Sequence, residues 1–394
     1  MTLKLEVYDE SSGTWIDKTS SCISLRRRIR PEGLEELDGE LVKDVVSVGQ
    51  KIRLKEDDRI KFMGIVYEIS RRHRGGNPET CGFKAYDYLI ACDRHVVYKL
   101  YQTGTKAGDI IRDLGKLIDD EIPVNLSGVE DGDALLSPWE IQNQKALDIM
   151  KSVARGTNYW LRMKPCLSYL AFDGGNYVSI QASSSLDARY SVSIAAWVKW
   201  KADVDGPIFT WQDPTTGRWG THVWRVGGKL FTRIVMRDGT FTNCLNVGNI
   251  PIDAWIFITS TYSYEEGVVR HYINGEFIGE LNIGSVEQST HGQAFIGKVP
   301  WDSRAVNGFI AQELVYNRVL SQTEIKNLYY DLISPPTDGL ILFFNFNEGS
   351  GSVIYDRSGN GNHGTIYGGA TWGYEVYPKY ANSMLLEFRP KVIA

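Results

Sequence analysis

A strand without a partner beside it sets the limits on how this chain can fold. Residues Asn158–Pro165 (NYWLRMKP) alternate like one arm of a β-hairpin. Tyr159, Leu161 and Met163 would face one side of the strand, and Trp160, Arg162 and Lys164 the other. A matching stretch, Met384–Pro390 (MLLEFRP), occurs only at the other end of the sequence. We expect these two arms to pair, with a complete second domain inserted where the hairpin turn would be.

Composition changes at the same place. Residues 1–165 carry 26 Lys or Arg and 27 Asp or Glu, whereas the longer stretch 166–378 carries only 14 and 20. The second stretch also holds eight of the eleven tryptophans. Because such different compositions indicate two separate cores, we expect a discontinuous first domain, 1–165 with 382–394, and an inserted domain, 166–381.

Charge and hydropathy exclude several classes of protein. A net charge of −5 gives no reason to expect nucleic-acid recognition, which needs a clustered basic surface. No run approaches the roughly 18 apolar residues of a membrane span. Met1–Glu10 alternates like a strand and is unlike a signal peptide, so we expect synthesis in a cytoplasm. The five cysteines form no CxxC pair and are expected to be free thiols.

The first domain is predicted to be β-rich with two helices. Helical spacing of apolar residues indicates one helix over Thr105–Asp120. Ser137 and Glu140 form a capping-box pattern that predicts a second helix, ending at Gly156. Asp38-Gly39 is typical of a turn. The predicted strands are Leu3–Tyr8, Cys22–Ile29, Leu41–Val48, Ile52–Leu54, Arg59–Arg71 and Cys81–Leu89.

This first region resembles the N-terminal part of tailed-phage baseplate hub proteins over roughly Val45–Met163. The resemblance depends on Ala85-Tyr86-Asp87-Tyr88, on Asp93-Arg94, on Val97-Tyr98-Lys99 and on Ala107–Ile111. In that family the arm equivalent to NYWLRM is followed by a short turn and a strand ending in FRPK, which is Phe388–Lys391 here. The resemblance implies a hub-type β-barrel domain (α+β) that assembles into a ring at the end of a tail tube.

The inserted region is predicted to be all-β. Short strand patterns alternate with Gly- and Asn-rich turns, and Asp238-Gly239 and Asn274-Gly275 stand where hairpin turns are expected. The stretches LAFDGGNYVSI, SVSIAAWVKW, HYINGEFIG and ILFFNFNEGSGSVIYDRSGNGNHGT resemble a laminin-G-like, concanavalin-A-type jelly roll across Tyr169–Trp372. Ser321 and Glu324 would cap the short helix that this family places after YNRxLS.

No catalytic pattern stands in a plausible place. Some lectin-like sandwiches are glucanases with an E-x-D-x-E strand, and Glu36-Leu37-Asp38-Gly39-Glu40 matches those letters. The motif lies outside the inserted domain and next to the expected turn, so we interpret it as coincidence. The chain is predicted to be non-enzymatic.

Calcium is the candidate cofactor. The loop Asp356–Asn362 (DRSGNGN) offers oxygen ligands of the kind that calcium prefers, with Asp356 and Asn360 as candidates. In the resembled family this loop often approaches the FDG motif around a structural calcium, which would make Asp173 its partner. The alternative is a metal-free turn in which Asp356 accepts hydrogen bonds from backbone amides.

Three tryptophans in turn-like, polar settings are candidates for stacking on sugar rings: Trp211, Trp219 and Trp301. For each of them, a partly buried packing role is the alternative.

Together these patterns predict a structural virion protein at a phage tail tip, made in the host cytoplasm. The first domain would form a ring, with a trimer favoured, beside the tail tube and the distal tail ring. The jelly roll would bind host-surface glycans or serve as decoration. The alternatives are a distal tail ring protein with a carbohydrate-binding insertion and a secreted carbohydrate-binding adhesin.

Overall fold

The chain divides into two compact units in the computed structural model. The first unit is Met1–Leu167 with Glu375–Ala394, and the second is Ser168–Tyr374. The bounds expected from the sequence, 165/166 and 381/382, lie near these divisions. The structure describes residues 2–31, 33–72, 79–119, 121–214, 216–376 and 378–391.

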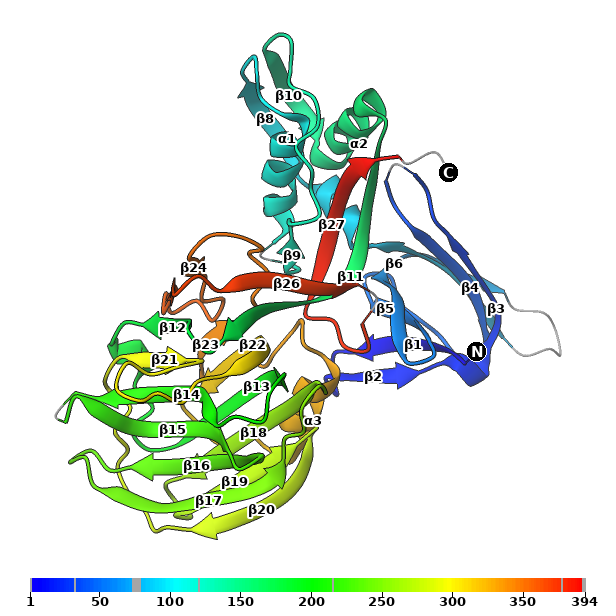
Figure 1. The fold of residues 1–394 in the computed structure, drawn as a ribbon. Helices are drawn as coiled ribbons and strands as arrows, with labels where there is room; N and C mark the ends of the chain where they lie inside the picture. The colour runs from blue at the N-terminus through cyan, green and yellow to red at the C-terminus, as the bar shows by residue number, and fades with distance from the viewer. Residues whose placement is uncertain are drawn as a thin grey trace. The chain divides into compact units, whose positions relative to one another are not determined.

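The two distant arms pair, as predicted. Strand β11 (Tyr159–Asp173) and strand β27 (Ser383–Pro390) run antiparallel, with Tyr159 opposite Pro390 and Cys166 opposite Ser383 (Figure 1). Lys164 Nζ lies 2.9 Å from Glu387 Oε1, and both side chains are mostly buried. Beyond Cys166, β11 continues into the second unit, so a single strand leads from one unit into the other.

The first unit contains an antiparallel sheet of seven strands in the order β2-β1-β5-β6-β7-β4-β3. Its core is formed by alternate residues such as Leu5, Leu37, Phe62 and Phe83. Among the described residues no pairing joins β2 to β3, so this order is open at both ends. The strands are β1 (Leu3–Asp9), β2 (Thr14–Asp17), β3 (Cys22–Arg28), β4 (Glu36–Val42), β5 (Lys51–Glu56), β6 (Arg59–Arg72) and β7 (Thr80–Asp87).

The remaining elements of the first unit correct two predictions. The first predicted helix, Thr105–Asp120, is shorter in the structure. Helix α1 spans Ala107–Gly115 and is followed by one 3-10 turn, Lys116–Ile118. Asp120 lies outside the described residues. The second predicted helix begins eight residues later than expected, at Ala146 in place of Pro138. Residues after Ser137-Pro138 form strand β10 (Trp139–Lys145), which pairs with β8 (Val96–Tyr101), and only then does α2 (Ala146–Thr157) start.

A tertiary strand pairing therefore overrides the local capping pattern at Ser137. Helix α2 ends at Asn158, whose left-handed backbone (φ 57°) makes it the cap in place of Gly156. The short strand β9 (Val124–Asn125) runs parallel to β27. A 3-10 helix, Tyr88–Arg94, follows β7 and is capped by the Asp87 carboxylate.

The turn predicted at Asp38-Gly39 is wrong. Both residues lie inside β4, where the pairing of Gly39 with Phe83 and Leu25 leaves no room for a side chain. The strand predicted at Leu41–Val48 is also mostly wrong. Strand β4 begins earlier, at Glu36, and ends at Val42.

The second unit consists of two packed β-sheets, as a jelly-roll sandwich requires. The first sheet has the order β20-β19-β18-β13-β22, and β22 then pairs with both β11 and β23. Its strands are β13 (Val192–Trp200), β18 (Ile256–Ser263), β19 (Val268–Ile273), β20 (Glu276–Asn282), β22 (Asn307–Tyr316) and β23 (Leu340–Phe344), and β26 (Thr371–Val376) pairs with β11.

The second sheet has eight strands in the order β17-β16-β15-β14-β21-β12-β25-β24. These are β12 (Tyr177–Ile180), β14 (Gly206–Asp213), β15 (Arg218–Val226), β16 (Lys229–Val235), β17 (Phe241–Asn249), β21 (Ala294–Ile296), β24 (Val353–Ile354) and β25 (Gly364–Tyr367).

Two local predictions in this unit are confirmed. Asn274 (φ 51°) and Gly275 (φ 81°) form the tight turn between β19 and β20, with the positive φ angles that such a hairpin needs. Helix α3 (Gln322–Tyr330) begins with the capping box of Ser321 and Glu324.

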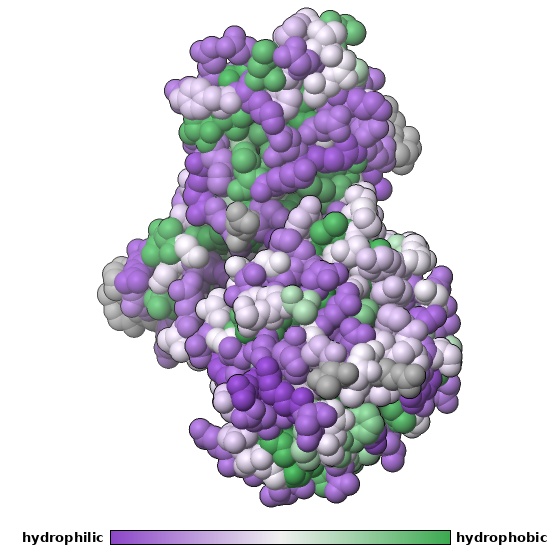
Figure 2. All heavy atoms as spheres, turned by 90° about the vertical axis from the view of Figure 1, so that its left-hand side faces the viewer, coloured by the Kyte–Doolittle hydropathy of each residue, from purple (hydrophilic) through white to green (hydrophobic). Residues whose placement is uncertain are grey.

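Surface features complete the description. Among the described residues, no helix is long and apolar enough to cross a membrane. On the face of the molecule seen in Figure 2, apolar residues gather in several separate groups among hydrophilic ones. The five cysteines are free thiols: Cys81, Cys92 and Cys166 are buried, and Cys22 and Cys244 are half-buried.

Candidate functional site

The eight-stranded sheet carries aromatic side chains on its outer face. Side chains alternate along each strand, so Val178, Val223 and Leu230 enter the core between the sheets while their neighbours face outward. The outward residues form a second apolar cluster, separate from that core. Its aromatic members are Tyr177 on β12, Trp219 and Trp224 on β15, Phe231 on β16, Phe295 on β21, and Trp301 from the loop after β21.

These rings touch one another in a continuous row. The Trp219 ring lies 5.3 Å from Trp224 and 5.7 Å from Trp301, centroid to centroid, and meets both edge-on. Trp301 lies 5.3 Å from Phe295. Farther along, Phe295 contacts Tyr177 at 6.1 Å. Trp224 and Phe295 are buried, and they hold the partly exposed rings of Trp219, Trp301 and Tyr177 in fixed positions.

One end of the row is hollowed. A cavity of about 280 Å³ lies over β15, β16 and β17. This volume is just below the roughly 300–1,000 Å³ of sites that take drug-sized ligands, so it suits one or two ring-sized groups. The cavity is lined by Trp219, His222, Trp224, Val226, Phe231, Arg233, Phe241 and Arg304.

Two guanidinium groups line this cavity. Arg304 is held by two hydrogen bonds to the Asp302 carboxylate, at 2.8 and 3.0 Å, and lies 4.7 Å from the centre of the Trp224 ring. Arg233 lies 5.4 Å from the Phe231 ring centre and 5.5 Å from that of Phe241. The cavity therefore combines flat apolar walls with positive charge.

His222 contributes a neutral imidazole. Burial lowers the pKa of His222 to about 4, so the ring is uncharged at neutral pH. Its Nδ1 lies 2.7 Å from the Gly220 carbonyl oxygen, which assigns the proton to Nδ1 and leaves Nε2 able to accept a hydrogen bond. The ring also stacks on Phe231 at 5.8 Å.

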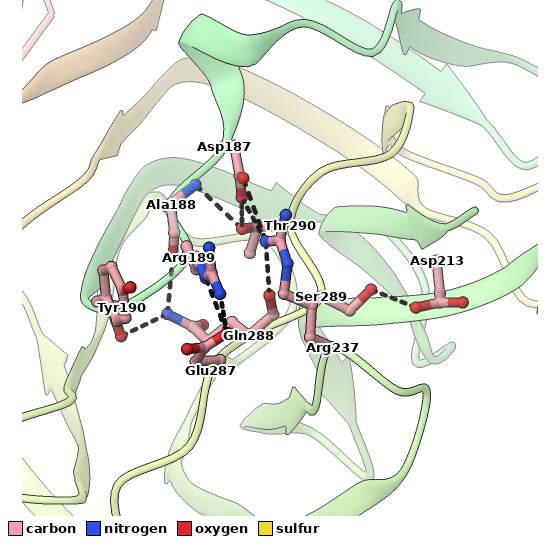
Figure 3. A network of polar contacts seen from close by, with 10 residues as sticks. All are labelled: Asp187, Ala188, Arg189, Tyr190, Asp213, Arg237, Glu287, Gln288, Ser289 and Thr290. Carbon is pink, nitrogen blue, oxygen red and sulfur yellow. Dashed lines mark hydrogen bonds and ion pairs between the residues drawn. The ribbon is translucent and has the colours of Figure 1, made fainter. Parts of the chain in front are cut away.

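A polar network joins the segment Glu287–Thr290 to β14, β15 and β16 (Figure 3). The Ser289 amide donates to Val235 on β16 and the Ser289 carbonyl accepts from Thr221 on β15. The side chains then anchor the segment itself, since Ser289 Oγ bonds to Asp213 at 2.5 Å and Thr290 Oγ1 to Asp187 at 2.6 Å. Arg237 completes the network with an ion pair to Asp187.

The three predicted tryptophans differ in position: two are partly exposed and one is buried. Trp219 and Trp301 lie side by side in the aromatic row and are partly exposed. Trp211 is fully buried, and its role as an exposed platform is corrected. On β14, Trp211 shares the inward side with Phe209, whereas Thr210 faces outward and accepts the Trp224 indole N–H at 2.7 Å.

Sequence reasoning missed Trp224, Phe231, His222 and Arg233. The signal was period-two alternation across the hairpin β15–β16, where the register places His222 opposite Arg233 and Trp224 opposite Phe231. Each pair crosses the hairpin on one face, so a correct register would have grouped all four.

The candidate calcium ligands are not brought together. Asp173 pairs with Asn307 at one end of β22, while Phe343, whose amide bonds to Asp356, is opposite Leu314. Seven residues of strand separate these positions, roughly 23 Å at about 3.3 Å per residue. Asp173 therefore cannot share an ion with the Asp356 loop.

The carboxylate oxygens of Asp356 are also in use. The Asp356 carboxylate accepts hydrogen bonds from the amides of Phe343, Ser358 and Asn362 and from the Ser358 hydroxyl, at 2.8–3.0 Å. Asn360 donates its side-chain amide to Leu340 and Ser358. Within the described ranges no three His, Cys, Asp or Glu side chains are grouped so as to hold a metal ion. These residues fit the metal-free turn and do not fit a calcium site.

The E-x-D-x-E motif, Glu36–Glu40, lies on strand β4. The turn expected at Asp38-Gly39 was one reason to reject the motif, and that reason does not hold. The three carboxylates of the motif share one face of β4 because side chains alternate. Two of them are matched with cations, however: Arg28 and Arg30 both bind Glu36, at 2.6 and 3.1 Å, and Arg28 lies 3.6 Å from Asp38. Lys84 is opposite Asp38 in the register of the next strand. The motif is part of a charged strand surface of the first unit.

Comparison with known families agrees with the fold of the second unit. Residues 172–326 match the model of the third laminin G family, described as the concanavalin A-like lectin/glucanases superfamily. The second unit is a laminin-G-like domain. No curated protein sequence matches the chain.

Solved structures with related folds are distant. A candidate carbohydrate binding protein from Bacteroides ovatus is 12% identical, with 80% of this chain and 77% of that chain covered and a TM-score of 0.44. A heptameric pentraxin from Limulus polyphemus is 14% identical over 54% of this chain and 94% of its own, with a TM-score of 0.37. At these TM-scores the likenesses carry no argument about function.

Proposed function

We propose that the laminin-G-like domain binds carbohydrate through its aromatic row, with Trp219 as the central platform. The observation that carries this proposal is the cavity at the end of the row, where indole rings stand beside groups that can exchange hydrogen bonds with hydroxyls. The carbon faces of sugar rings are apolar and their rims are polar, so they need both kinds of contact. The lectin description of the matching family supports the same ligand class.

We propose binding without hydrolysis. Glycoside hydrolysis requires two carboxyl groups on either side of the scissile bond. Among the described residues that line the cavity, none is Asp or Glu. Incubation of the protein with a bound oligosaccharide should leave its length unchanged, and release of shorter sugars would contradict this part of the proposal.

The first unit would serve as the carrier. Its resemblance to baseplate hub proteins supports a ring-forming subunit at a phage tail tip, with a trimer favoured and with the tail tube and distal tail ring as neighbours. Several weak glycan sites on one ring would bind a cell surface tightly through avidity. The virion is the location that this role implies.

Glycan binding is tested with the full chain on a glycan array, beside Trp219→Ala. We expect the wild type to bind a set of glycans and Trp219→Ala to lose most of that signal. Phe277→Ala is the matched control, because Phe277 is an exposed ring, 50% accessible, on a strand of the other sheet. Equal loss in both variants, or a wild type that binds no glycan, would contradict the proposal.

The carrier role is tested by the native mass of the purified chain. A closed ring of three or six subunits is the expected result. A strict monomer would contradict the ring and favour the alternative of a carbohydrate-binding adhesin that acts alone.

A further inference from the structure

Arg233 has an unusual environment for an arginine. It lies on β16, opposite His222 on β15 and Cys244 on β17. Its guanidinium is placed between the Phe231 and Phe241 rings, 5.4 and 5.5 Å from their centres, and it lines the cavity. The two rings orient the group without neutralising it.

The Nε of Arg233 is buried and has no hydrogen-bond acceptor within the part of the chain that the structure describes. No ion pair of Arg233 occurs there either. The other arginines of this unit whose side chains are described have polar partners: Arg189 with Glu287, Arg225 with Asp203, Arg237 with Asp187, Arg270 with Glu266 and Glu280, Arg304 with Asp302, Arg318 with Glu324, and Arg357 with Asn345 and Asn347. Arg233 is the exception.

An unmatched donor of this kind indicates that something else supplies the acceptor. Buried polar groups are nearly always hydrogen-bonded, and leaving a charged donor unmatched is destabilising. The positive charge is also not offset by the rest of the lining. Arg304 is neutralised by Asp302, and the pKa of His222 keeps that ring uncharged at neutral pH.

The net charge of the second unit limits which anions the Arg233 cation would attract. Residues 168–374 carry 14 Lys or Arg and 19 Asp or Glu, so the unit as a whole is acidic. An acidic unit does not attract polyanions in general. A single uncompensated cation in its aromatic cavity therefore favours one anionic group at one place.

We infer that the cavity selects a sugar unit bearing an anionic substituent, a carboxylate or a sulfate. The sugar ring would lie on the partly exposed Trp219, and the anion would accept hydrogen bonds from the Arg233 guanidinium. A planar guanidinium forms paired hydrogen bonds with two oxygens of such a group, which an ammonium does not. This inference rests on the proposed carbohydrate-binding function and adds the class of sugar.

The test is calorimetric titration of the full chain with three oligosaccharides of equal length: one of uronic acid units, one of sulfated units and one of neutral units. We expect one acidic oligosaccharide to bind at least tenfold more tightly than the neutral one, as charged hydrogen bonds typically allow. The comparison of the two acidic probes shows whether carboxylate or sulfate is the natural group.

Arg233→Met should abolish that preference, so that the acidic and neutral oligosaccharides bind this variant with the same affinity. Arg233→Lys should keep only part of it. Lys229→Met, which removes an exposed cation from the same strand, is the matched control and should keep the full preference. Raising the salt concentration should weaken acidic binding in the wild type and not in Arg233→Met.

The outcomes separate the two claims. Trp219-dependent binding of the neutral oligosaccharide, with no acidic preference or with a preference that survives Arg233→Met, would overturn the inference and leave the proposed function standing. Absence of any Trp219-dependent binding would overturn the proposed function itself.

Discussion

Two sheet faces in this molecule carry arginines in opposite ways. On the seven-stranded sheet of the first unit, cations and carboxylates of neighbouring strands match: Arg28 and Arg30 bind Glu36, and Lys84 lies 3.4 Å from Glu68. On the outer face of the eight-stranded sheet, Arg233 is surrounded by aromatic rings and has no carboxylate partner in the described chain.

The difference supports the proposal that the second face, and not the first, is a ligand site. On the first face, cations and carboxylates on neighbouring strands pair with each other and stabilise the strand pairing. These side chains therefore need no ligand to neutralise them. The Arg233 cation, whose Nε has no acceptor in the described chain, leaves a donor for the proposed ligand. The number of charged side chains alone would favour the first face as a ligand-binding surface. Taking ion pairing into account favours the second face.

The largest expected effect separates a core tryptophan from a platform tryptophan. Trp211→Ala should lower the stability of the second unit by about 3–5 kcal/mol, because it empties a fully buried site. Trp219→Ala should cost about 1–2 kcal/mol, since the ring is only partly buried. Scanning calorimetry of both variants measures this, and equal destabilisation would remove the distinction between core and platform.

A second effect concerns the pH dependence of the aromatic face. The folded pKa of His222 is about 4, below its unfolded value of about 6.5, so the unfolded state binds a proton first as the pH falls. The contribution of the neutral ring is present above pH 6.5 and is lost as the pH falls towards 4, on the order of 3 kcal/mol.

His222→Gln should therefore show a flatter decline of melting temperature between pH 6.5 and 4 than the wild type. The comparison between the two proteins is needed because buried Glu313, whose pKa is raised by desolvation, changes stability in the opposite direction as the pH rises. Parallel declines in both proteins would contradict the assignment of a buried neutral imidazole.

A smaller effect contrasts a paired charge with an unpaired one. Glu36→Gln should destabilise the first unit by about 1–2 kcal/mol, because a buried carboxylate with two arginine partners is lost. Arg233→Met should leave the stability of the second unit within about 0.5 kcal/mol of the wild type, since no ion pair is broken. Denaturant unfolding checks both, and a reversed order would contradict the comparison between the faces.

The smallest expected effect is that of metal removal. Because Asp173 and the Asp356 loop lie at different ends of β22 and the Asp356 oxygens already accept four hydrogen bonds, a chelator should leave the melting temperature unchanged. A drop of several degrees that added calcium reverses would show a site that these residues do not explain.

The sequence predicted those features in which local pattern and tertiary structure agree. The alternation of NYWLRMKP and its match near the end of the chain predicted the pairing of β11 with β27, and Asn274-Gly275 predicted a tight turn because only that geometry suits both residues. Ser321 and Glu324 predicted the start of α3.

Predictions failed where a partner distant in sequence decided the outcome. The capping pattern at Ser137 lost to the pairing of β10 with β8, and the turn signal at Asp38-Gly39 lost to the two neighbours of β4. For the candidate site, Trp219 and Trp301 were predicted from their polar, turn-like settings; the structure places them side by side, and their sugar-binding role stays a prediction. Trp224 and Arg233 were not, because only the hairpin register brings them to the same face.

The central claim is that the outer aromatic face of the second unit holds a sugar ring. Its most direct test is a crystal structure of the full chain with the tightest-binding oligosaccharide from the titrations. The account predicts a sugar ring against Trp219, with an anionic group within hydrogen-bond distance of Arg233. A sugar bound at the Asp356 loop, or on the charged face of the first unit, would contradict it.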